Sequence, residues 1–231
     1  MITGVLIAEG ASARADAPTT KRYRVSDGQT IIGHASLIIG SVALGAVLLG
    51  YLQGSEIVPM FAVGSCGLVF ASLWCTITKQ YPIATVYGAF AGFNFSYALL
   101  QLGVSHDWYA IPIDSLTTVL LVYALSWLGI FLLLSFIAYQ ASLTSLGLFL
   151  SVSAGLGLVA GATGAGSLTL LRWAAVPVGL VALLSVSAIG HVMWGWHVRN
   201  HIARQRARGA VVGGPAHLAA DRRLRSRTPA E

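Results

Sequence analysis

The sequence predicts an all-α, polytopic membrane protein, and three observations lead to that fold class. The 231-residue chain is 56% apolar and only 10% charged, against about 25% charged residues in an ordinary soluble domain. Its interior is poorer still, because residues 31–196 hold only five charged side chains: Glu56, Lys79, Asp107, Asp114 and Arg172. The other seventeen charged residues lie in the two ends of the chain. A segment with so little charge is expected to be surrounded by lipid rather than water.

The apolar interior divides into six segments at its polar or proline-containing breaks. Crossing about 30 Å of hydrocarbon takes about 20 helical residues, and each segment meets that length: 31–52, 57–77, 82–104, 116–138, 143–165 and 170–196. Every segment lacks Asp, Glu, Lys and Arg except the last, where Arg172 lies near the start and can reach the headgroups. Since a central charge costs about 2.5 to 3.5 kcal/mol, the pattern predicts six spanning helices.

The connections between these segments are short, which predicts that neighbouring helices run antiparallel. Six crossings place both termini on one side, and those termini hold twelve of the fourteen basic residues. The positive-inside rule makes that side cytoplasmic. Lys79 then falls inside while Glu56, Asp107 and Asp114 fall outside, and Arg172 is the exception. We expect a multi-pass protein of the cytoplasmic (inner) membrane.

The charge pattern also predicts the domain organisation. Residues 1–29 form a disordered cytoplasmic tail, because no basic residue precedes their apolar run and Glu9 interrupts it, unlike a signal peptide. Residues 30–197 form the transmembrane domain. Residues 198–231 form a second disordered tail that is rich in Arg, Ala and Gly. This tail either orients the last helix against anionic lipid or docks a partner, and no nucleic-acid binding is expected.

Small residues recur at a spacing of four in the third and fifth segments. The glycines in these rows are Gly88 and Gly92, Gly155, and Gly157 with Gly161. A row of small side chains lets two helix backbones approach closely, which matters in lipid because helix association there relies on packing. The pattern therefore predicts tight packing of these two helices.

A polar stripe runs along the third segment. Tyr87, Asn94 and Gln101 recur every seven residues and so share one helix face, with the small Ala91 and Ala98 between them. An amide in hydrocarbon is costly unless it is hydrogen-bonded, so Asn94 must face protein or water. The stripe has two interpretations that the sequence leaves open: contact with a solute, or hydrogen bonding to a neighbouring helix.

Two histidines, His34 and His191, lie near the cytoplasmic ends of the first and sixth segments. With an unperturbed pKa of about 6.5, histidine changes charge in the physiological range, so this pair can be proton-responsive. The pair can also ligate a metal or haem, or bond to backbone and headgroups. Two isolated histidines without a spacing motif are weak evidence for ligation, so no cofactor or metal is expected.

The chain carries none of the common catalytic motifs. It has no His-Glu-x-x-His, no Gly-x-Ser-x-Gly, no phosphate-binding loop and no paired carboxylates within a span. We therefore do not expect an enzyme.

The third segment begins Thr85-Val86-Tyr87-Gly88-Ala89-Phe90. This resembles the Ser-Tyr-Gly-x-Phe-Trp segment of the acetate uptake transporter family, with Val86 in place of Ser and Ala91 in place of Trp. Tyr123-x-x-x-Trp127 followed by Phe131 is also similar to that family in its spacing, and the likeness covers roughly residues 60–195. The family's Asn/Asp-Pro-Ala-Pro-Leu-Gly-Leu signature is missing, since only an Asp and an aliphatic residue remain at 27–31.

The resemblance implies a six-helix acetate or succinate permease that forms a homo-oligomer, a hexameric ring with a pore through each protomer. Urea and amide channels use a similar ring.

These observations together predict a membrane permease or channel for a small solute, with a short monocarboxylate such as acetate as the best candidate. Tyr87, Asn94, Gln101 and Tyr123 are the expected path residues. No basic side chain lies in a helix middle to hold a carboxylate, so passage is expected to be of low affinity or proton-coupled. The alternatives are a urea or amide channel, and a non-transporting assembly or regulatory subunit. The expected partners are the solute, membrane lipid and further copies of the chain.

Overall fold

The structure is a computed structural model that describes residues 27–52 and 54–212. These residues form helices joined by short connections, with no strand among them. The elements are α1 (Asp27–Leu48), the 3-10 helix η1 (Gly54–Ile57), α2 (Val58–Ile77), α3 (Tyr81–Ser105), α4 (Ile113–Ala141), α5 (Leu143–Ala165), α6 (Leu168–Trp173) and α7 (Ala175–Val212). Six helical stretches are long and apolar enough to cross a membrane, with α6 and α7 counted as one. The predicted all-helical, six-span architecture is confirmed.

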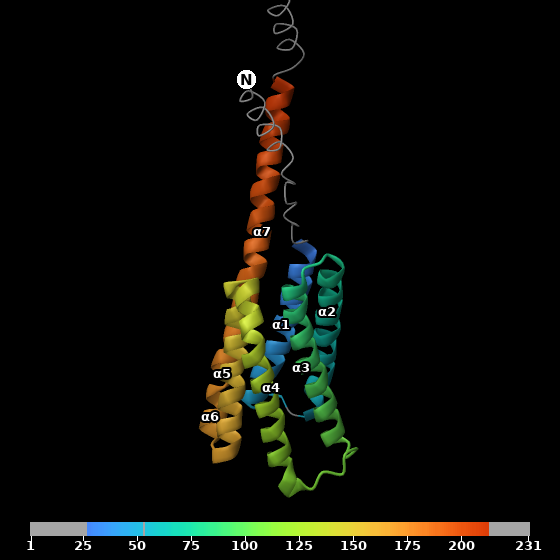
Figure 1. Cartoon of the computed structure of the whole chain (residues 1–231), viewed down its shortest axis with the longest axis vertical. Coiled ribbons are helices and arrows are strands. Elements are labelled where there is room, and N and C mark those ends of the chain that lie inside the picture. Colours follow the sequence, from blue (N-terminus) through green and yellow to red (C-terminus); the bar gives the residue numbers. More distant parts are fainter. Residues whose placement is uncertain (1–26, 53, 213–231) are drawn as a thin grey trace, which may run out of the picture.

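Successive spans run antiparallel, and both ends of the described chain lie at the same end of the bundle (Figure 1). Helix α2 packs between α1 and α3, α5 packs between α4 and α7, and the long contact of α1 with α7 joins the two halves. Helices α3 and α4 touch more sparsely. The bundle is therefore a ring of helices whose inner faces surround the region where the candidate site lies.

The start of α1 differs from the predicted boundary. We expected residues 1–29 to form a tail, but α1 begins at Asp27 and Gln29 is almost fully buried. The side-chain amide of Gln29 donates to Oγ1 of Thr78 at 3.0 Å, and Gln80 donates to Oε1 of Gln29 at 3.4 Å. These bonds hold the first turn of α1 against the α2–α3 connection, which lets the helix start earlier than its apolar run. Residues 1–26 of the predicted tail lie outside the described residues.

The last span also differs from its prediction in two ways. It is interrupted at Ala174, three residues before Pro177. Proline lacks an N–H and its ring clashes with the carbonyl four residues earlier. For Pro177 that carbonyl belongs to Trp173, where α6 ends. Helix α7 then continues to Val212, so the predicted tail boundary at 198 is too early. The Arg, Gln and Ala residues of 199–212 are good helix formers, and no proline lies in this stretch.

The closest helix approaches occur where the spacing of small residues did not predict them. A Cβ atom added to Gly33 would overlap the ring of Tyr87, and one on Gly67 would overlap Oγ of Ser36. A Cβ on Gly40 would lie 2.8 Å from Nδ2 of Asn94. These glycines let α1 approach α2 and α3, and hydrogen bonds between α2 and α3 add to the packing. Ser65 Oγ donates to the carbonyl of Ala91 at 2.7 Å, and Ser72 Oγ to that of Ala84 at 2.8 Å.

The glycines predicted to mediate packing divide into two groups. A Cβ on Gly155 would meet Val178 of α7 at 3.2 Å, one on Gly88 would meet Ser72 of α2 at 3.3 Å, and one on Gly92 would meet Trp127 of α4 at 3.3 Å. Gly161 only approaches Leu170 at van der Waals distance, and Gly157 has nothing within 4 Å. Gly157 therefore has no packing partner among the described residues of this chain. A spacing of four creates a row of small residues, but it does not decide which rows meet a neighbour.

We predict that Gly40→Ala destabilises the bundle by about 1 to 3 kcal/mol, because the new methyl group overpacks a site where Asn94 cannot easily move away. The far side of Asn94 is closed, since Gly64 of α2 lies against the same amide. Thermal unfolding of the purified protein in detergent measures the effect.

Gly45→Ala is the matched control on the same helix. Nothing lies within 4 Å of a Cβ at Gly45, so that variant should stabilise the protein by up to about 1 kcal/mol through helix propensity alone. Equal melting temperatures for the two variants would show that α1 does not approach α3 closely at Gly40.

Candidate functional site

Two cavities of small-ligand size lie inside the ring of helices. The first, which we call the histidine cavity, has a volume of about 320 Å³ and is bounded by α1, α3, α5 and α7. His34, His191 and Tyr87 line it, together with the hydroxyl-bearing residues Thr30, Ser142, Thr144 and Ser145. It lies at the end of the bundle where α1, α3 and α5 begin. The structure thus brings three of the predicted site residues, one from each of three helices, into a single cavity.

His34 is one of the buried polar side chains of this cavity. It is only 8% exposed, and its Nδ1 atom has no hydrogen-bond partner among the described residues. Its ring meets the ring of Tyr87 edge to face, with centroids 5.9 Å apart and planes at 85°. An unpaired buried polar atom costs about 1 to 3 kcal/mol, and the ring contact with Tyr87 helps to hold the imidazole in place. His191 is exposed and belongs to the other half of the bundle.

The second cavity, which we call the tyrosine cavity, has a volume of about 270 Å³. Gln101 and Tyr123 line it together with Tyr97 and Thr163, and the rest of its lining is apolar. The Tyr123 hydroxyl lies 2.9 Å from Oγ of Ser96 and donates to the carbonyl of Phe93 at 3.2 Å. Tyr97 and Gln101 belong to the C-terminal half of α3, so the tyrosine cavity lies nearer the end of the bundle opposite to the histidine cavity (Figure 1).

Three phenylalanine rings pack together on α3, α4 and α5, and two of them, Phe90 and Phe149, lie along their helices between residues that line the two cavities. Phe90 of α3, Phe131 of α4 and Phe149 of α5 form a triangle with centroid distances of 5.2, 5.3 and 5.4 Å. All three are at most 3% exposed. We call them the phenylalanine triad. On α3 the last residue of the histidine cavity, Tyr87, and the first of the tyrosine cavity, Phe93, are six residues apart, a rise of about 9 Å. Along α3, the two cavities are therefore only about two turns of helix apart.

Asn94 lines neither cavity. It is 4% exposed and its amide lies against Gly40 of α1 and Gly64 of α2, where added Cβ atoms would come within 2.8 and 3.4 Å of Nδ2. Of the two interpretations of the polar stripe, helix packing fits Asn94, and solute contact fits Tyr87 and Gln101. The same face of α3 therefore has different neighbours at different levels. It meets α1 and α2 at Asn94, the histidine cavity at Tyr87 and the tyrosine cavity at Gln101.

Sequence reasoning missed two groups of residues that the structure adds to the site. The first is Tyr97, whose ring lies 5.8 Å from that of Tyr123 and which stands one turn before Gln101. Its spacing of four from Gln101 was an available signal. The second is the Ser142, Thr144 and Ser145 cluster, where Ser142 Oγ accepts from the Ser145 backbone N–H at 3.0 Å as an N-cap. The serine preceding an apolar run was an available cap signal.

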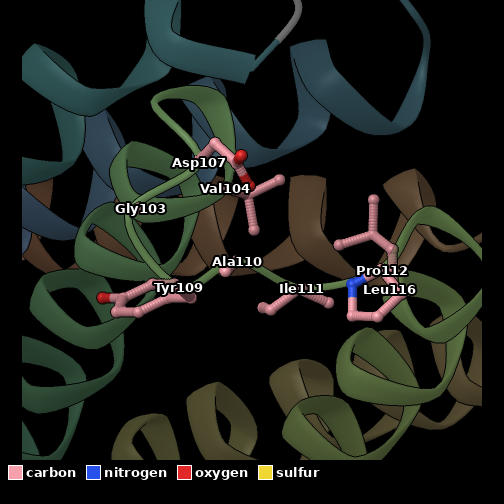
Figure 2. Close-up of a pocket in the computed structure, with 8 residues that line it drawn as sticks. All are labelled: Gly103, Val104, Asp107, Tyr109, Ala110, Ile111, Pro112 and Leu116. Carbon is pink, nitrogen blue, oxygen red and sulfur yellow. The ribbon is translucent and has the colours of Figure 1, made fainter.

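A third cavity, of about 500 Å³, is formed by the α3–α4 connection. Figure 2 shows Tyr109 on one side of it and Pro112 with Leu116 on the other. Asp107 is the one acidic residue that lines it, and no predicted site residue does so. Asp107 and Ala110 adopt left-handed backbone conformations, with φ of 54° and 46°. This cavity lies in a loop and contains too few polar groups to suggest a binding role.

The chemistry available inside the bundle is hydrogen bonding. The lining residues of the histidine and tyrosine cavities offer imidazole, phenol, amide and hydroxyl groups, and none of them is Lys, Arg, Asp or Glu. Within residues 27–52 and 54–212, no three His, Cys, Asp or Glu side chains are grouped as a metal site would require. Such a lining can bind a small polar solute weakly and reversibly.

Comparison with models of protein families, with characterised proteins and with solved structures finds no match for this chain.

Proposed function

We propose that this protein is a membrane permease or channel for a small polar solute, with a short monocarboxylate such as acetate as its substrate. One observation carries the proposal: two cavities with hydrogen-bonding groups in their linings lie at different levels of the same ring of helices, and the phenylalanine triad packs at a level between them. Their volumes are at or just below the lower end of the range for ligand sites. Solutes of a few heavy atoms fit such cavities better than larger metabolites do.

In this proposal the solute binds in the tyrosine cavity, passes the phenylalanine triad when the rings rotate, and binds again in the histidine cavity. Tyr123 and Gln101 form hydrogen bonds with it in the first cavity, and Tyr87 and His34 in the second. No fixed charge faces either cavity among the described lining residues, so binding is weak at each step. Weak binding favours release and suits a low-affinity or proton-coupled route.

The orientation and assembly of the protein belong to the same proposal. The basic residues concentrated in both ends of the sequence support placing those ends in the cytoplasm, with the bundle in the cytoplasmic membrane. The tyrosine cavity then faces outward and the histidine cavity inward. The resemblance to acetate uptake transporters supports a homo-oligomer, a hexamer, with one path in each protomer.

Two other functions compete with monocarboxylate transport. A urea or amide channel is favoured by Gln101, because an amide side chain matches a neutral amide solute and the cavities lack charge. A non-transporting assembly or regulatory subunit is favoured by Asn94, which packs between helices rather than facing a path, and by the closed phenylalanine triad.

Liposomes containing the purified protein distinguish the three functions. We expect uptake of labelled acetate that is faster at acidic than at neutral pH and that exceeds the uptake of labelled urea. Protein-free liposomes correct for diffusion of acetic acid through the bilayer. Urea uptake that does not depend on pH would instead support an amide channel, and no uptake of either solute would support a non-transporting subunit.

The phenylalanine triad generates a second prediction. Phe149→Leu removes one ring from the layer while retaining an apolar side chain, so acetate uptake should rise several-fold. Phe149→Trp enlarges the ring and should lower uptake. The initial uptake rate, normalised to the amount of reconstituted protein, measures both effects.

Phe70→Leu is the matched control for this pair. Phe70 is 51% exposed on α2 and contacts Trp74 on the outside of the bundle, so its replacement should leave the rate unchanged. If Phe149→Leu and Phe70→Leu transport acetate at the same rate, the phenylalanine triad is not the barrier to passage.

A further inference from the structure

The lining of the tyrosine cavity is mainly apolar. Apart from Tyr97, Gln101, Tyr123 and Thr163, every residue that lines it is aliphatic, phenylalanine or glycine. The aliphatic side chains come from α1, α4, α5, α6 and α7, and none of the lining residues is charged. Such a wall offers van der Waals contact to an apolar molecule, whereas a strongly hydrated molecule would lose its water there with little in exchange.

The hydroxyl groups of this lining already have partners within the protein. The Tyr123 hydroxyl donates to a backbone carbonyl of α3 at 3.2 Å, and the Thr163 hydroxyl donates to a backbone carbonyl of its own helix at 2.8 Å. The Tyr97 hydroxyl pairs with the side chain of Gln101. These hydroxyl groups therefore do not require a polar ligand to complete their hydrogen bonding.

Gln101 gives the cavity one polar point. Its carboxamide offers two donor hydrogens and an acceptor oxygen, which is more than the hydrogen bond with Tyr97 uses. A ligand that matches this lining is therefore mainly apolar and carries one hydrogen-bonding group. It has no charge, since a charge would be buried here without a counter-ion.

The volume of the cavity limits the size of that ligand. An apolar cavity of about 150 Å³ holds benzene, so the tyrosine cavity, at about 270 Å³, accommodates about ten non-hydrogen atoms. A phospholipid acyl chain has more carbon atoms than that. Gln101 of α3 and Leu120 of α4 both line the cavity, and these two helices touch sparsely. A small molecule dissolved in the bilayer can therefore enter between them.

We propose that the tyrosine cavity is a binding site for a small uncharged amphiphile, such as an alcohol with a hydrocarbon body of about ten non-hydrogen atoms. The body fills the apolar part of the cavity, and the polar group hydrogen-bonds with Gln101. This ligand class goes beyond the proposed function, because it differs from the small polar solute proposed for transport. A bound amphiphile occupies one of the two cavities of the proposed route, so it inhibits acetate uptake.

Photolabelling of the full-length protein in nanodiscs tests this site. The photoreactive alcohol 3-azioctanol is uncharged and of suitable size, and after illumination mass spectrometry locates the residues to which it has bonded. We expect saturable labelling of residues that line the tyrosine cavity, and an excess of 1-octanol should remove it. Octanoate at the same concentration and neutral pH should not remove it, because its carboxylate is ionised there.

Variants test the polar and the apolar part of the site separately. Gln101→Leu should weaken displacement by 1-octanol about fivefold, as expected for the loss of one neutral hydrogen bond. Val159→Phe should reduce cavity labelling several-fold, because the larger side chain fills part of the space. Leu150→Phe is the matched control on the same helix, since Leu150 is 48% exposed and lies outside the cavity, and it should be labelled like the unaltered chain.

Cavity labelling that 1-octanol removes and octanoate does not would support the site, whether or not the liposomes take up acetate. Labelling confined to lipid-facing residues such as Phe70, or equal displacement by octanoate and 1-octanol, would overturn it. Equal cavity labelling of folded Val159→Phe and Leu150→Phe would also overturn it. If Val159→Phe does not fold, the location of the label and the competition in the unaltered protein decide the question.

Discussion

The scarcity of charge between residues 31 and 196 is the constraint on which the rest of this structure depends. Hydrocarbon offers no hydrogen-bond partner, so each polar group in the bundle must be paired within the protein or face an internal cavity. Ser65 and Ser72 meet this requirement by donating to backbone carbonyls of α3. Gln29 meets it through Thr78 and Gln80. These short-range bonds and the close glycine contacts join α1, α2 and α3 into one half of the bundle.

The same constraint shapes the interior between the two halves. Two groups of polar side chains lie at different levels of this interior, one around His34 and Tyr87 and the other around Gln101 and Tyr123. The phenylalanine triad fills the level between them. This alternation of polar, aromatic and polar layers requires no fixed charge, since hydroxyl, amide and imidazole groups supply hydrogen bonds without the cost of burying an ion. It also permits only weak binding of a small polar molecule.

Helix direction adds a difference between the two cavities that composition alone would not create. The antiparallel arrangement brings the starts of α1, α3 and α5 to the same end of the bundle, and the histidine cavity lies among them. The tyrosine cavity is lined instead by Gln101 and Tyr97, in the C-terminal half of α3, and by Tyr123 of α4. Two cavities of similar size are therefore lined by different parts of the helices, although neither lining includes Lys, Arg, Asp or Glu.

By itself, the sequence determined that the chain is helical and has six segments long and apolar enough to cross a membrane, because span length and absence of charge are local properties that can be read along the chain. It also placed Tyr87, Gln101 and Tyr123 among the residues of interest. Only the tertiary structure decided that Asn94 of the same stripe packs against Gly40 and Gly64, and that Gly157 packs against nothing. A heptad repeat specifies one face of a helix, but which neighbours that face meets at each level depends on how the other helices cross it.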